Sequence, residues 1–277
     1  GESEAQIIEA FKLANENEIP LFILGGGSNV LISDQGFDGL VLQIALKGIE
    51  TKDNFVTAQA GEDWDGFVKF CVEKKLAGIE CLSGIPGFVG AVPVQNVGAY
   101  GQEVSETITK VRVFDRKTGE VLELTNDDCK FAYRSSIFNT SAKNRFIVLA
   151  VTFDLIKNGK PKIAYKDLRE FFIGKRPNLA RMREAVLQIR RAKSMVIDKN
   201  DINSQSAGSF FKNPIVSNEK LAEMLENTGL EKIPFFQMGE DKVKISAAWL
   251  IENAGFRKGF KKGKAGLSAN HTLALTN

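Results

Sequence analysis

Histidine is almost absent from this sequence, with His271 the only one among 277 residues. This scarcity excludes a metal centre built from several histidines, and a Ser-His-Asp triad would have to use His271 itself. The three cysteines, Cys71, Cys81 and Cys129, form no CxxC pair, and their odd number argues against a disulfide scaffold. We therefore expect no metal site and a reducing, cytoplasmic compartment.

The net charge is also small. The 37 Lys and Arg residues nearly balance the 34 Asp and Glu residues, and the resulting net charge of +3 excludes a strongly basic nucleic-acid-binding protein. No apolar stretch approaches the roughly 18 uncharged residues that a membrane-spanning helix needs, and the polar start Gly1-Glu2-Ser3-Glu4 does not resemble a signal peptide. We expect small-molecule partners for a monomeric protein, with no nucleic acid and no membrane among them.

Hydrophobic periodicity predicts a mixture of helices and strands. Apolar residues recur at helical spacing over 3–18, 64–72, 179–193, 218–228 and 247–251. Apolar runs or alternating patterns predict strands at 20–24, 30–32, 40–44, 54–60, 109–115, 121–124, 146–155 and 272–276. The length favours two compact units, and we place their boundary in the polar segment 194–208.

A glycine-rich segment, Gly25-Gly26-Gly27-Ser28-Asn29, follows the predicted strand 20–24. Glycine permits positive φ and close backbone approach, so consecutive N–H groups can surround a phosphate. The segment is neither GxGxxG nor a Walker A loop, because no lysine follows it. The pattern alone leaves two interpretations open, a phosphate-binding loop and a glycine hairpin.

A second irregular and apolar segment extends from Leu82 to Gly101 and contains five glycines and two prolines. Irregular backbone of this apolar character is usually buried against another part of the protein. Two glycine-rich loops far apart in the sequence suit a long ligand with several polar groups, such as a dinucleotide. A buried Ω-loop is the alternative explanation of the second segment.

Three further segments carry candidate polar groups. Arg134, beside Tyr133, offers a planar fork for a carboxylate or phosphate, although such an arginine more often forms a surface ion pair. Ser209 lies between a glycine and two phenylalanines, and is either a shielded donor or a serine that caps a turn. The run 256–264 contains five basic residues and two phenylalanines, and either holds a diphosphate or is a solvated loop.

In their order along the chain, these segments resemble those of one family. The order is GGGSNVLI, SGIPGFVGAVPVQNVGAYG, FAYRSSIF, AGSFFKNP and KISAAWLIENAG. It is similar to that of the UDP-N-acetylenolpyruvoylglucosamine reductases (MurB), enzymes of bacterial peptidoglycan precursor synthesis. The resemblance covers about residues 5–277, and Tyr165 with the segments 199–216 and 218–264 indicates the longer form of the family.

The resemblance implies an α+β fold with a vanillyl-alcohol-oxidase/PCMH-type FAD-binding domain of two subdomains and a C-terminal α+β substrate-binding domain. We expect the FAD-binding domain at 1–195, with subdomains at about 1–47 and 48–195, and the substrate-binding domain at 196–277. FAD is expected to be bound non-covalently, with NADPH as co-substrate. The residues implied to bind FAD are Gly25, Gly26, Gly27, Ser28, Asn29, Gly84, Ile85, Pro86, Gly90 and Gly98.

The resemblance also implies an oxidoreductase, UDP-N-acetylmuramate dehydrogenase, with catalytic roles for two residues. Arg134 matches the arginine that stabilises negative charge developing beside the substrate carboxylate, with Tyr133 as its support. Ser209 matches the serine that delivers a proton to the carbanionic carbon. The residues implied to hold the sugar nucleotide are Tyr165, Lys193, Asn213 and Lys258.

The sequence departs from the family pattern in three places. The usual N-terminal segment is missing, phenylalanine occupies the Phe235-Phe236 region where the family often has tyrosine, and no residue matches the family's C-terminal catalytic glutamate. We therefore expect a chain that is truncated at both ends. Two alternatives stay open, an FAD-dependent sugar or lactone oxidase of the same fold and a catalytically impaired flavin- or nucleotide-binding fragment. His271 lies far from the glycine loops in sequence, which argues against an oxidase with covalent flavin.

Overall fold

The computed structural model describes all 277 residues and divides into two compact units, Gly1–Arg191 and Ala192–Asn277. The sequence-based boundary lies a few residues further along, after residue 195. The functions assigned to the two parts of the chain stay predictions.

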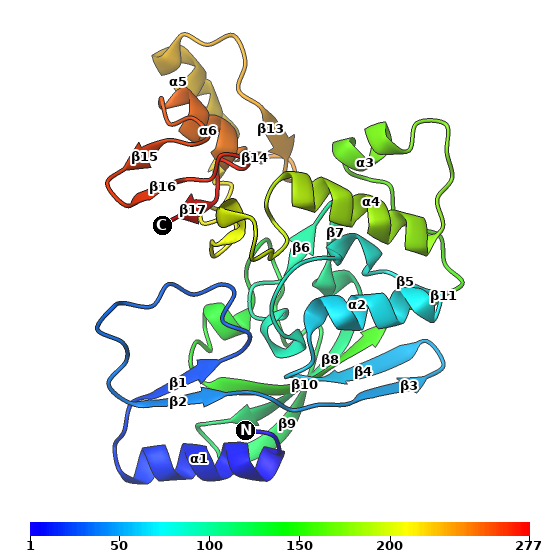
Figure 1. Ribbon diagram of the computed structural model, residues 1–277, viewed down its shortest axis with the longest axis vertical. Helices are drawn as coiled ribbons and strands as arrows, with labels where there is room; N and C mark the ends of the chain where they lie inside the picture. The colour runs from blue at the N-terminus through cyan, green and yellow to red at the C-terminus, as the bar shows by residue number, and fades with distance from the viewer. The chain divides into compact units, whose positions relative to one another are not determined.

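The first unit is built on a five-stranded antiparallel sheet (Figure 1). The strand order is β3 (Ile49–Lys52), β4 (Phe55–Gln59), β10 (Phe146–Asp154), β8 (Ile108–Asp115) and β9 (Glu120–Thr125). A tight turn joins the antiparallel strands β8 and β9, and Gly119 has φ +77° there. The central strand β10 is almost entirely buried, which explains its nearly continuous apolar sequence.

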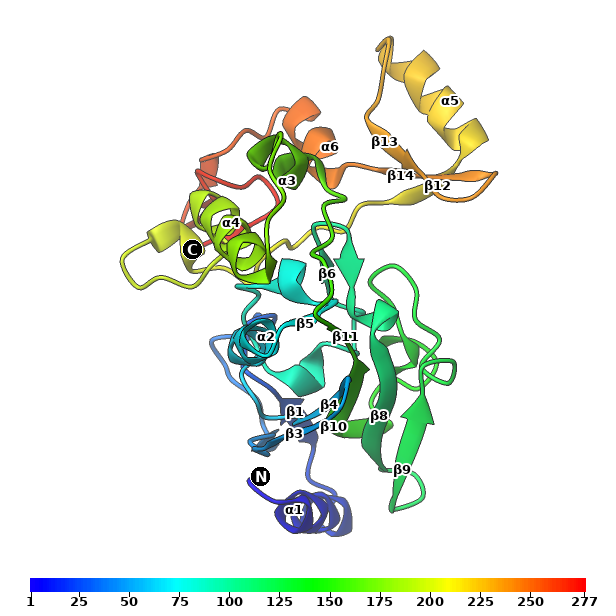
Figure 2. The same ribbon diagram turned by 90° about the vertical axis from the view of Figure 1, so that its right-hand side faces the viewer.

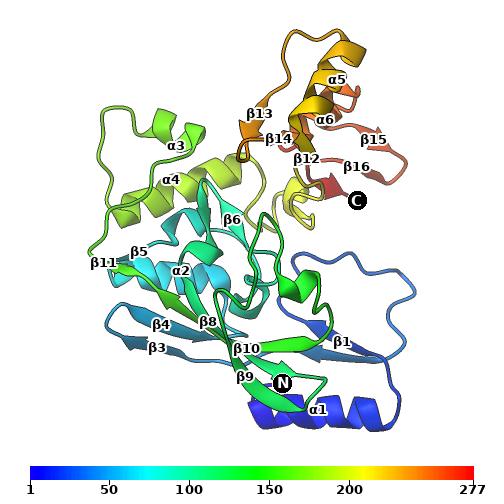
Figure 3. The same cartoon turned by 180° about the vertical axis from the view of Figure 1, so that it is seen from behind.

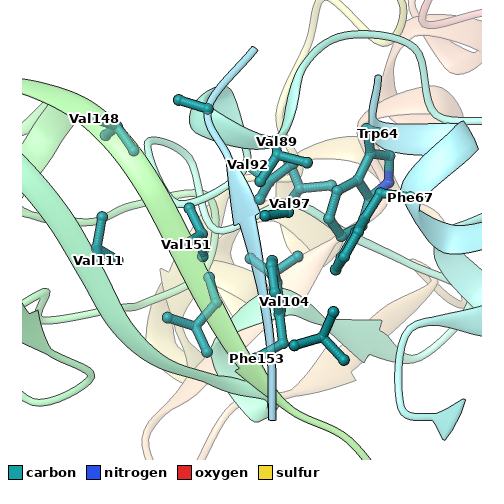
Figure 4. Packing of buried hydrophobic residues seen from close by; sticks show 14 of the residues in the cluster. Trp64, Phe67, Val89, Val92, Val97, Val104, Val111, Val148, Val151 and Phe153 are labelled. Atoms are coloured by element: carbon teal, nitrogen blue, oxygen red, sulfur yellow. The ribbon is translucent and has the colours of Figure 1, made fainter. Parts of the chain in front are cut away.

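Helices α1 (Glu4–Glu16) and α2 (Trp64–Glu73) cover opposite faces of this sheet (Figure 1). On one face, the rings of Phe11 in α1 and Phe114 in β8 lie 5.2 Å apart. Side chains alternate between the two faces along a strand, so Val111, three residues before Phe114 in β8, lies on the opposite face. There Phe67 of α2 packs on Phe153 at 5.0 Å, as Figure 4 shows together with the surrounding valines.

The start of helix α2 and its buried face can be explained from its sequence. The Asp63 side chain accepts the Gly66 N–H and caps the first turn. Apolar residues then repeat at helical spacing, which gives the helix one buried face. That face consists of Trp64, Phe67, Val68, Cys71 and Val72.

Strands β1 (Leu21–Leu24) and β2 (Leu40–Gln43) pair in parallel, joined by residues 25–39. The predicted strand at 30–32 is wrong: these residues form no strand, and Leu31 is 88% exposed. The glycine-hairpin interpretation of residues 25–29 is also wrong, because a hairpin requires antiparallel strands.

The second irregular segment is buried as predicted, with Leu82, Val89, Val92 and Val97 in the core. It contains the short paired strands β6 (Gly98–Ala99) and β7 (Gln102–Glu103). Strands β5 (Leu76–Ala77) and β11 (Ile156–Lys157) form another short pair.

Helices α3 (Lys166–Phe171) and α4 (Leu179–Ala192) complete the first unit's elements. The apolar residues of α4 form one face, on which Met182, Ala185 and Val186 are buried and Ile189 is half-buried. Together with Leu168 of α3 they pack around Cys81. Arg190 is buried on the same helix, although its charge predicts exposure.

In the second unit, helix α5 (Asn218–Thr228) lies along a sheet of β12 (Ile215–Ser217), β14 (Lys242–Ile245) and β13 (Phe235–Gln237) (Figure 2). Ser217 caps the start of α5, and Gly229 ends it with φ +64°.

Helix α6 (Ala247–Asn253) leads to the β15–β16 hairpin, visible from behind in Figure 3. The bounds are Lys261–Lys262 for β15, Ala265–Leu267 for β16 and Leu275–Thr276 for β17. The predicted terminal strand is therefore shorter than 272–276. The longest helix, α4, has 14 residues, and none of the helices is long and apolar enough to cross a membrane.

Candidate functional site

The first glycine loop, Gly25–Asn29, leaves the end of β1 with open backbone donors. No protein acceptor takes the N–H groups of residues 26–29. The Ser28 hydroxyl donates to Pro86 O at 3.1 Å, and the Gln43 side chain donates to Gly25 O at 3.2 Å. The loop is thus held by its side chains and carbonyls, which leaves its amides available to an anionic ligand.

Close contact between the two loops explains why glycine is required. A Cβ atom at Gly26 would lie 3.0 Å from Gly87 Cα, and one at Gly87 would lie 3.0 Å from Ser28 Oγ. Gly27 has φ +73°. The sequence predicted that the two loops serve one ligand, and the structure brings them into direct contact.

The second loop is fastened to the start of α2. The Trp64 indole donates to Leu82 O at 3.1 Å, and the Trp64 amide donates to Gly87 O at 2.9 Å. The amides of Gly84 and Gly90 donate to Asp65 Oδ1 at 2.5 Å and to Ala60 O at 2.8 Å. The N–H groups of Gly84 and Gly90 are therefore already bonded within the protein, and these two residues determine the path of the loop backbone.

The acceptor of the Gly84 amide, Asp65, belongs to an ion pair that the sequence analysis missed. Arg183 of α4 donates to both carboxylate oxygens of Asp65, at 2.6 and 2.7 Å. Burial alone would raise the pKa of Asp65, but the bonds from Arg183 and Gly84 and the charge of Arg183 hold it below its ordinary value. The two residues are 118 positions apart, so no local pattern could reveal the pair.

Arg134 occupies a tight turn whose closing residues, Ala132 and Ser135, exchange backbone hydrogen bonds of 3.0 and 3.1 Å. Its φ is +53°, an uncommon conformation for a residue with a side chain. The guanidinium donates to Asn96 O at 3.3 Å and to Gly98 O, and lies 5.4 Å from the Tyr133 ring centre. Tyr133 thus supports the arginine, as predicted from the sequence.

The turn is tied to the second loop at two further points. Ser136 Oγ donates to Val94 O at 2.7 Å, and the Asn96 side chain donates to Ala132 O at 3.0 Å. A guanidinium has five N–H donors, and only part of this set is spent on backbone carbonyls. Arg134 therefore offers a fixed cation with donors left for a carboxylate.

Tyr165 contacts the same loop through Tyr100, whose ring centre lies 5.5 Å away in an edge-on arrangement. Tyr100 has φ +51°, and its side chain accepts a hydrogen bond from Arg190. Burial lowers the pKa of Arg190, which this bond and Asp65 partly offset. The first unit thus brings together the two loops, Arg134 and Tyr165.

In the second unit, Ser209 is exposed and pairs with Ala274. The next residue, Phe210, donates its amide to Leu273 O at 2.8 Å. The Ser268 amide donates to Ala274 O at 2.9 Å, and the Gly259 amide donates to Ser268 O at 3.2 Å. The segments of Ser209, Ala274 and Ser268 therefore lie side by side, and the turn that contains Lys258 and Gly259 is joined to the last of them.

Asn213 is bonded to the first residue of α6, whose N-cap is Ser246, because Asn213 Oδ1 accepts the Ala247 N–H at 2.9 Å. This bond fixes the amide plane and leaves Nδ2 as the donor for a substrate. Lys258 is exposed in the basic run, whereas Lys193 is partly buried directly after α4. The roles of these residues and of Ser209 in substrate binding and catalysis stay predictions.

Two family models match the chain. The model of an FAD binding domain matches residues 1–125, and the model of the UDP-N-acetylenolpyruvoylglucosamine reductase C-terminal domain matches residues 200–277. This order of domains confirms the predicted α+β fold class and FAD as the cofactor.

Curated relatives match almost the entire chain. The UDP-N-acetylenolpyruvoylglucosamine reductase of Streptomyces coelicolor is 45% identical over 285 residues, which cover 99% of this chain and 74% of that protein. The enzyme of the same name from Thermobifida fusca is 44% identical over 289 residues, covering 99% and 81%. The crystal structure of MurB from Thermus caldophilus matches with a TM-score of 0.65 and 25% identity, covering 100% of this chain and 79% of that one. The chain therefore belongs to the UDP-N-acetylenolpyruvoylglucosamine reductase family.

Proposed function

We propose that this chain reduces UDP-N-acetylglucosamine enolpyruvate to UDP-N-acetylmuramate in peptidoglycan precursor synthesis, with NADPH as the reductant. The observation that carries the proposal is the Arg134 turn, a guanidinium fixed on loop carbonyls in a chain of this family. Such a cation suits the carboxylate of an enolpyruvyl group, because Arg pairs with carboxylates through two parallel donors.

The first glycine loop fits the diphosphate of FAD. Its amides at residues 26–29 have no protein acceptor, and Gly26 and Gly27 place no side chain over them. Ile85 and Pro86 of the second loop are half-buried and complete the binding surface. FAD held by these loops would supply the hydride chemistry, by which a hydride from NADPH would reach the methylene carbon of the enolpyruvyl group.

Arg134 stabilises the charge that this addition creates. The neighbouring carbon, which bears the carboxylate, becomes electron-rich, and the charge spreads onto the carboxylate oxygens. Because the guanidinium is already held by Asn96 O and Gly98 O, little reorganisation is needed as the charge forms.

Ser209 Oγ delivers a proton to that same carbon and completes the reduction. A serine hydroxyl is a weak acid, so this transfer is effective only toward a strongly basic carbon. Pairing of Ser209 with Ala274 fixes the backbone from which the hydroxyl projects. Tyr165, Lys193, Asn213 and Lys258 hold the sugar nucleotide, with the basic run around Lys258 suited to its diphosphate.

The test is a product analysis with the purified protein carrying FAD. NADPH and the enolpyruvyl sugar nucleotide should be consumed in equal amounts, and the product should gain two hydrogens in its mass spectrum. A second incubation with oxygen and free sugars or lactones examines the oxidase alternative. Substrate oxidation there, without reduction of the enolpyruvyl compound, would refute the proposed function.

A further inference from the structure

The anchors of the second glycine loop are unevenly distributed. Residues 87–90 are held by backbone groups of residues 60–64, and Leu82 is held by the Trp64 indole. Between these ends, residues 84–86 are fixed from outside the loop by two side chains. Asp65 accepts the amide of Gly84 at 2.5 Å, and Ser28 donates to Pro86 O at 3.1 Å.

Asp65 therefore influences the open amides of the first loop through a short chain of contacts. It fixes Gly84, which has φ +73° and is the point where the chain turns after Leu82. Two residues later, Pro86 O accepts from Ser28, which belongs to the first loop. A displaced Gly84 would move Pro86 and loosen the contact that holds residues 26–29 in place.

We propose that Asp65 is a positioning residue for FAD, which fixes the second glycine loop through Gly84 while Arg183 holds the carboxylate in place. This inference rests on the proposed function, because it takes the two loops as the flavin site. The Arg183 side chain is 13% exposed and donates to both oxygens of Asp65, so the carboxylate has one defined orientation. The pair acts through backbone geometry, since the Gly84 N–H is spent on Asp65.

A comparison of two substitutions separates the loop contact from the ion pair. Asp65→Asn removes the charge but keeps an oxygen acceptor for the Gly84 amide, whereas Asp65→Ala removes both. FAD titrations of the full-length apoprotein, followed by flavin fluorescence, should show a dissociation constant about tenfold or more higher for Asp65→Ala, the loss expected for one hydrogen bond to a charged group. Asp65→Asn should stay within about threefold of the wild type, because the acceptor is retained.

The chain offers a matched control in the pair of Asp115 and Arg145. Asp115 also receives two donors from one arginine and a backbone N–H, from Lys117 at 2.9 Å, but it belongs to β8 outside the glycine loops. Asp115→Asn should lower the thermal stability of the apoprotein and leave the FAD dissociation constant unchanged. Equal weakening of FAD binding by Asp65→Ala and Asp115→Asn would show a general loss of stability and overturn the proposal.

A measurement on the wild-type protein keeps the proposal testable if Asp65→Ala does not fold. Amide hydrogen exchange, followed residue by residue by NMR, should show new protection at residues 26–29 on addition of FAD. The Gly84 amide should already be protected in the apoprotein and change little. Protection of Gly84 that appears only with FAD would overturn the role of Asp65. Wild-type protein that binds no FAD would instead refute the proposed function together with it.

Discussion

A Cβ atom at position 98 would lie 3.0 Å from Arg134 Nη1, so the guanidinium lies directly against the backbone of Gly98. The same Cβ atom would also lie 2.8 Å from Glu103 Cγ and 3.0 Å from Gln102 O in the paired strand. Gly98 also accepts a hydrogen bond from Arg134 through its carbonyl. The sequence associated Gly98 with FAD, whereas the structure gives it a direct part in setting the position of the arginine.

Gly98→Ala should therefore impair the substrate step while FAD remains bound. The added methyl group would meet the guanidinium as well as Glu103 Cγ and Gln102 O, and a shift of about 1 Å at a positioned group can cost up to about 100-fold in rate. We expect flavin reoxidation by the enolpyruvyl sugar to slow by at least about tenfold, with flavin reduction by NADPH nearly normal. Arg134→Lys, which keeps the charge but loses the planar fork, should behave in the same way. Normal reoxidation in both variants would remove Arg134 from the mechanism.

Ser209→Ala should affect only the step that requires a proton. Rates of flavin reoxidation should fall by about 10²–10⁴-fold, the range for loss of a general acid, while reduction by NADPH is unchanged. Ser206→Ala is the control, because Ser206 Oγ accepts the Gly208 amide at 3.2 Å and so shapes the same turn. If the two variants lose activity equally, Ser209 has a structural role.

Glu80 is fully buried and receives three donors, Gly78 N at 2.7 Å, Gln102 Nε2 at 2.9 Å and Lys162 N at 3.0 Å. Glu80→Ala would leave all three without this acceptor. Each buried donor without a partner costs about 1–3 kcal/mol, so the free energy of unfolding should fall by roughly 3 kcal/mol or more. Urea denaturation of the variant and of Glu80→Gln, which keeps one acceptor oxygen, provides the comparison. A loss below about 1 kcal/mol in Glu80→Ala would contradict this account.

Acid should weaken the contribution of Asp115 to stability. Its carboxylate is buried, and the hydrogen bonds from Arg145 hold its pKa below the ordinary value. A depressed pKa in the folded state stabilises the protein above the unfolded pKa of about 3.9, and this stabilisation is lost as the pH falls through the folded value. The difference in unfolding free energy between wild type and Asp115→Asn should be full at neutral pH and shrink below about pH 4. A difference that does not change with pH in this range would show that Asp115 makes no such contribution.

Much of the fold could be predicted because local pattern and burial agree. Helices α2 and α4 have apolar residues at helical spacing and bury that face. The strand expected at 30–32 fails for the opposite reason, since its apolar side chains are exposed and residue 31 is the most exposed large hydrophobic residue. Apolar sequence predicts burial only where the rest of the fold supplies a partner surface.

The candidate site could be predicted only in part. Glycine loops can be recognised in the sequence, because a positive φ or the close approach of another backbone segment favours glycine at a particular position. Gly27 has the positive φ, and Gly26 lies against the backbone of Gly87. The pair of Asp65 and Arg183 has no such signal, since it arises where two helices distant in sequence meet. The positive φ of Tyr100 could not be predicted from the sequence either, because the surrounding structure imposes it.

The most direct test of the account is a double-mixing stopped-flow experiment without oxygen. The protein with bound FAD is first reduced by a single equivalent of NADPH, and is then mixed with UDP-N-acetylglucosamine enolpyruvate while flavin absorbance is followed. We expect rapid return of oxidised flavin together with one equivalent of UDP-N-acetylmuramate, as the proposed function requires. Flavin that stays reduced in the presence of the enolpyruvyl compound, in a protein that has taken up FAD and accepted the hydride, would contradict it.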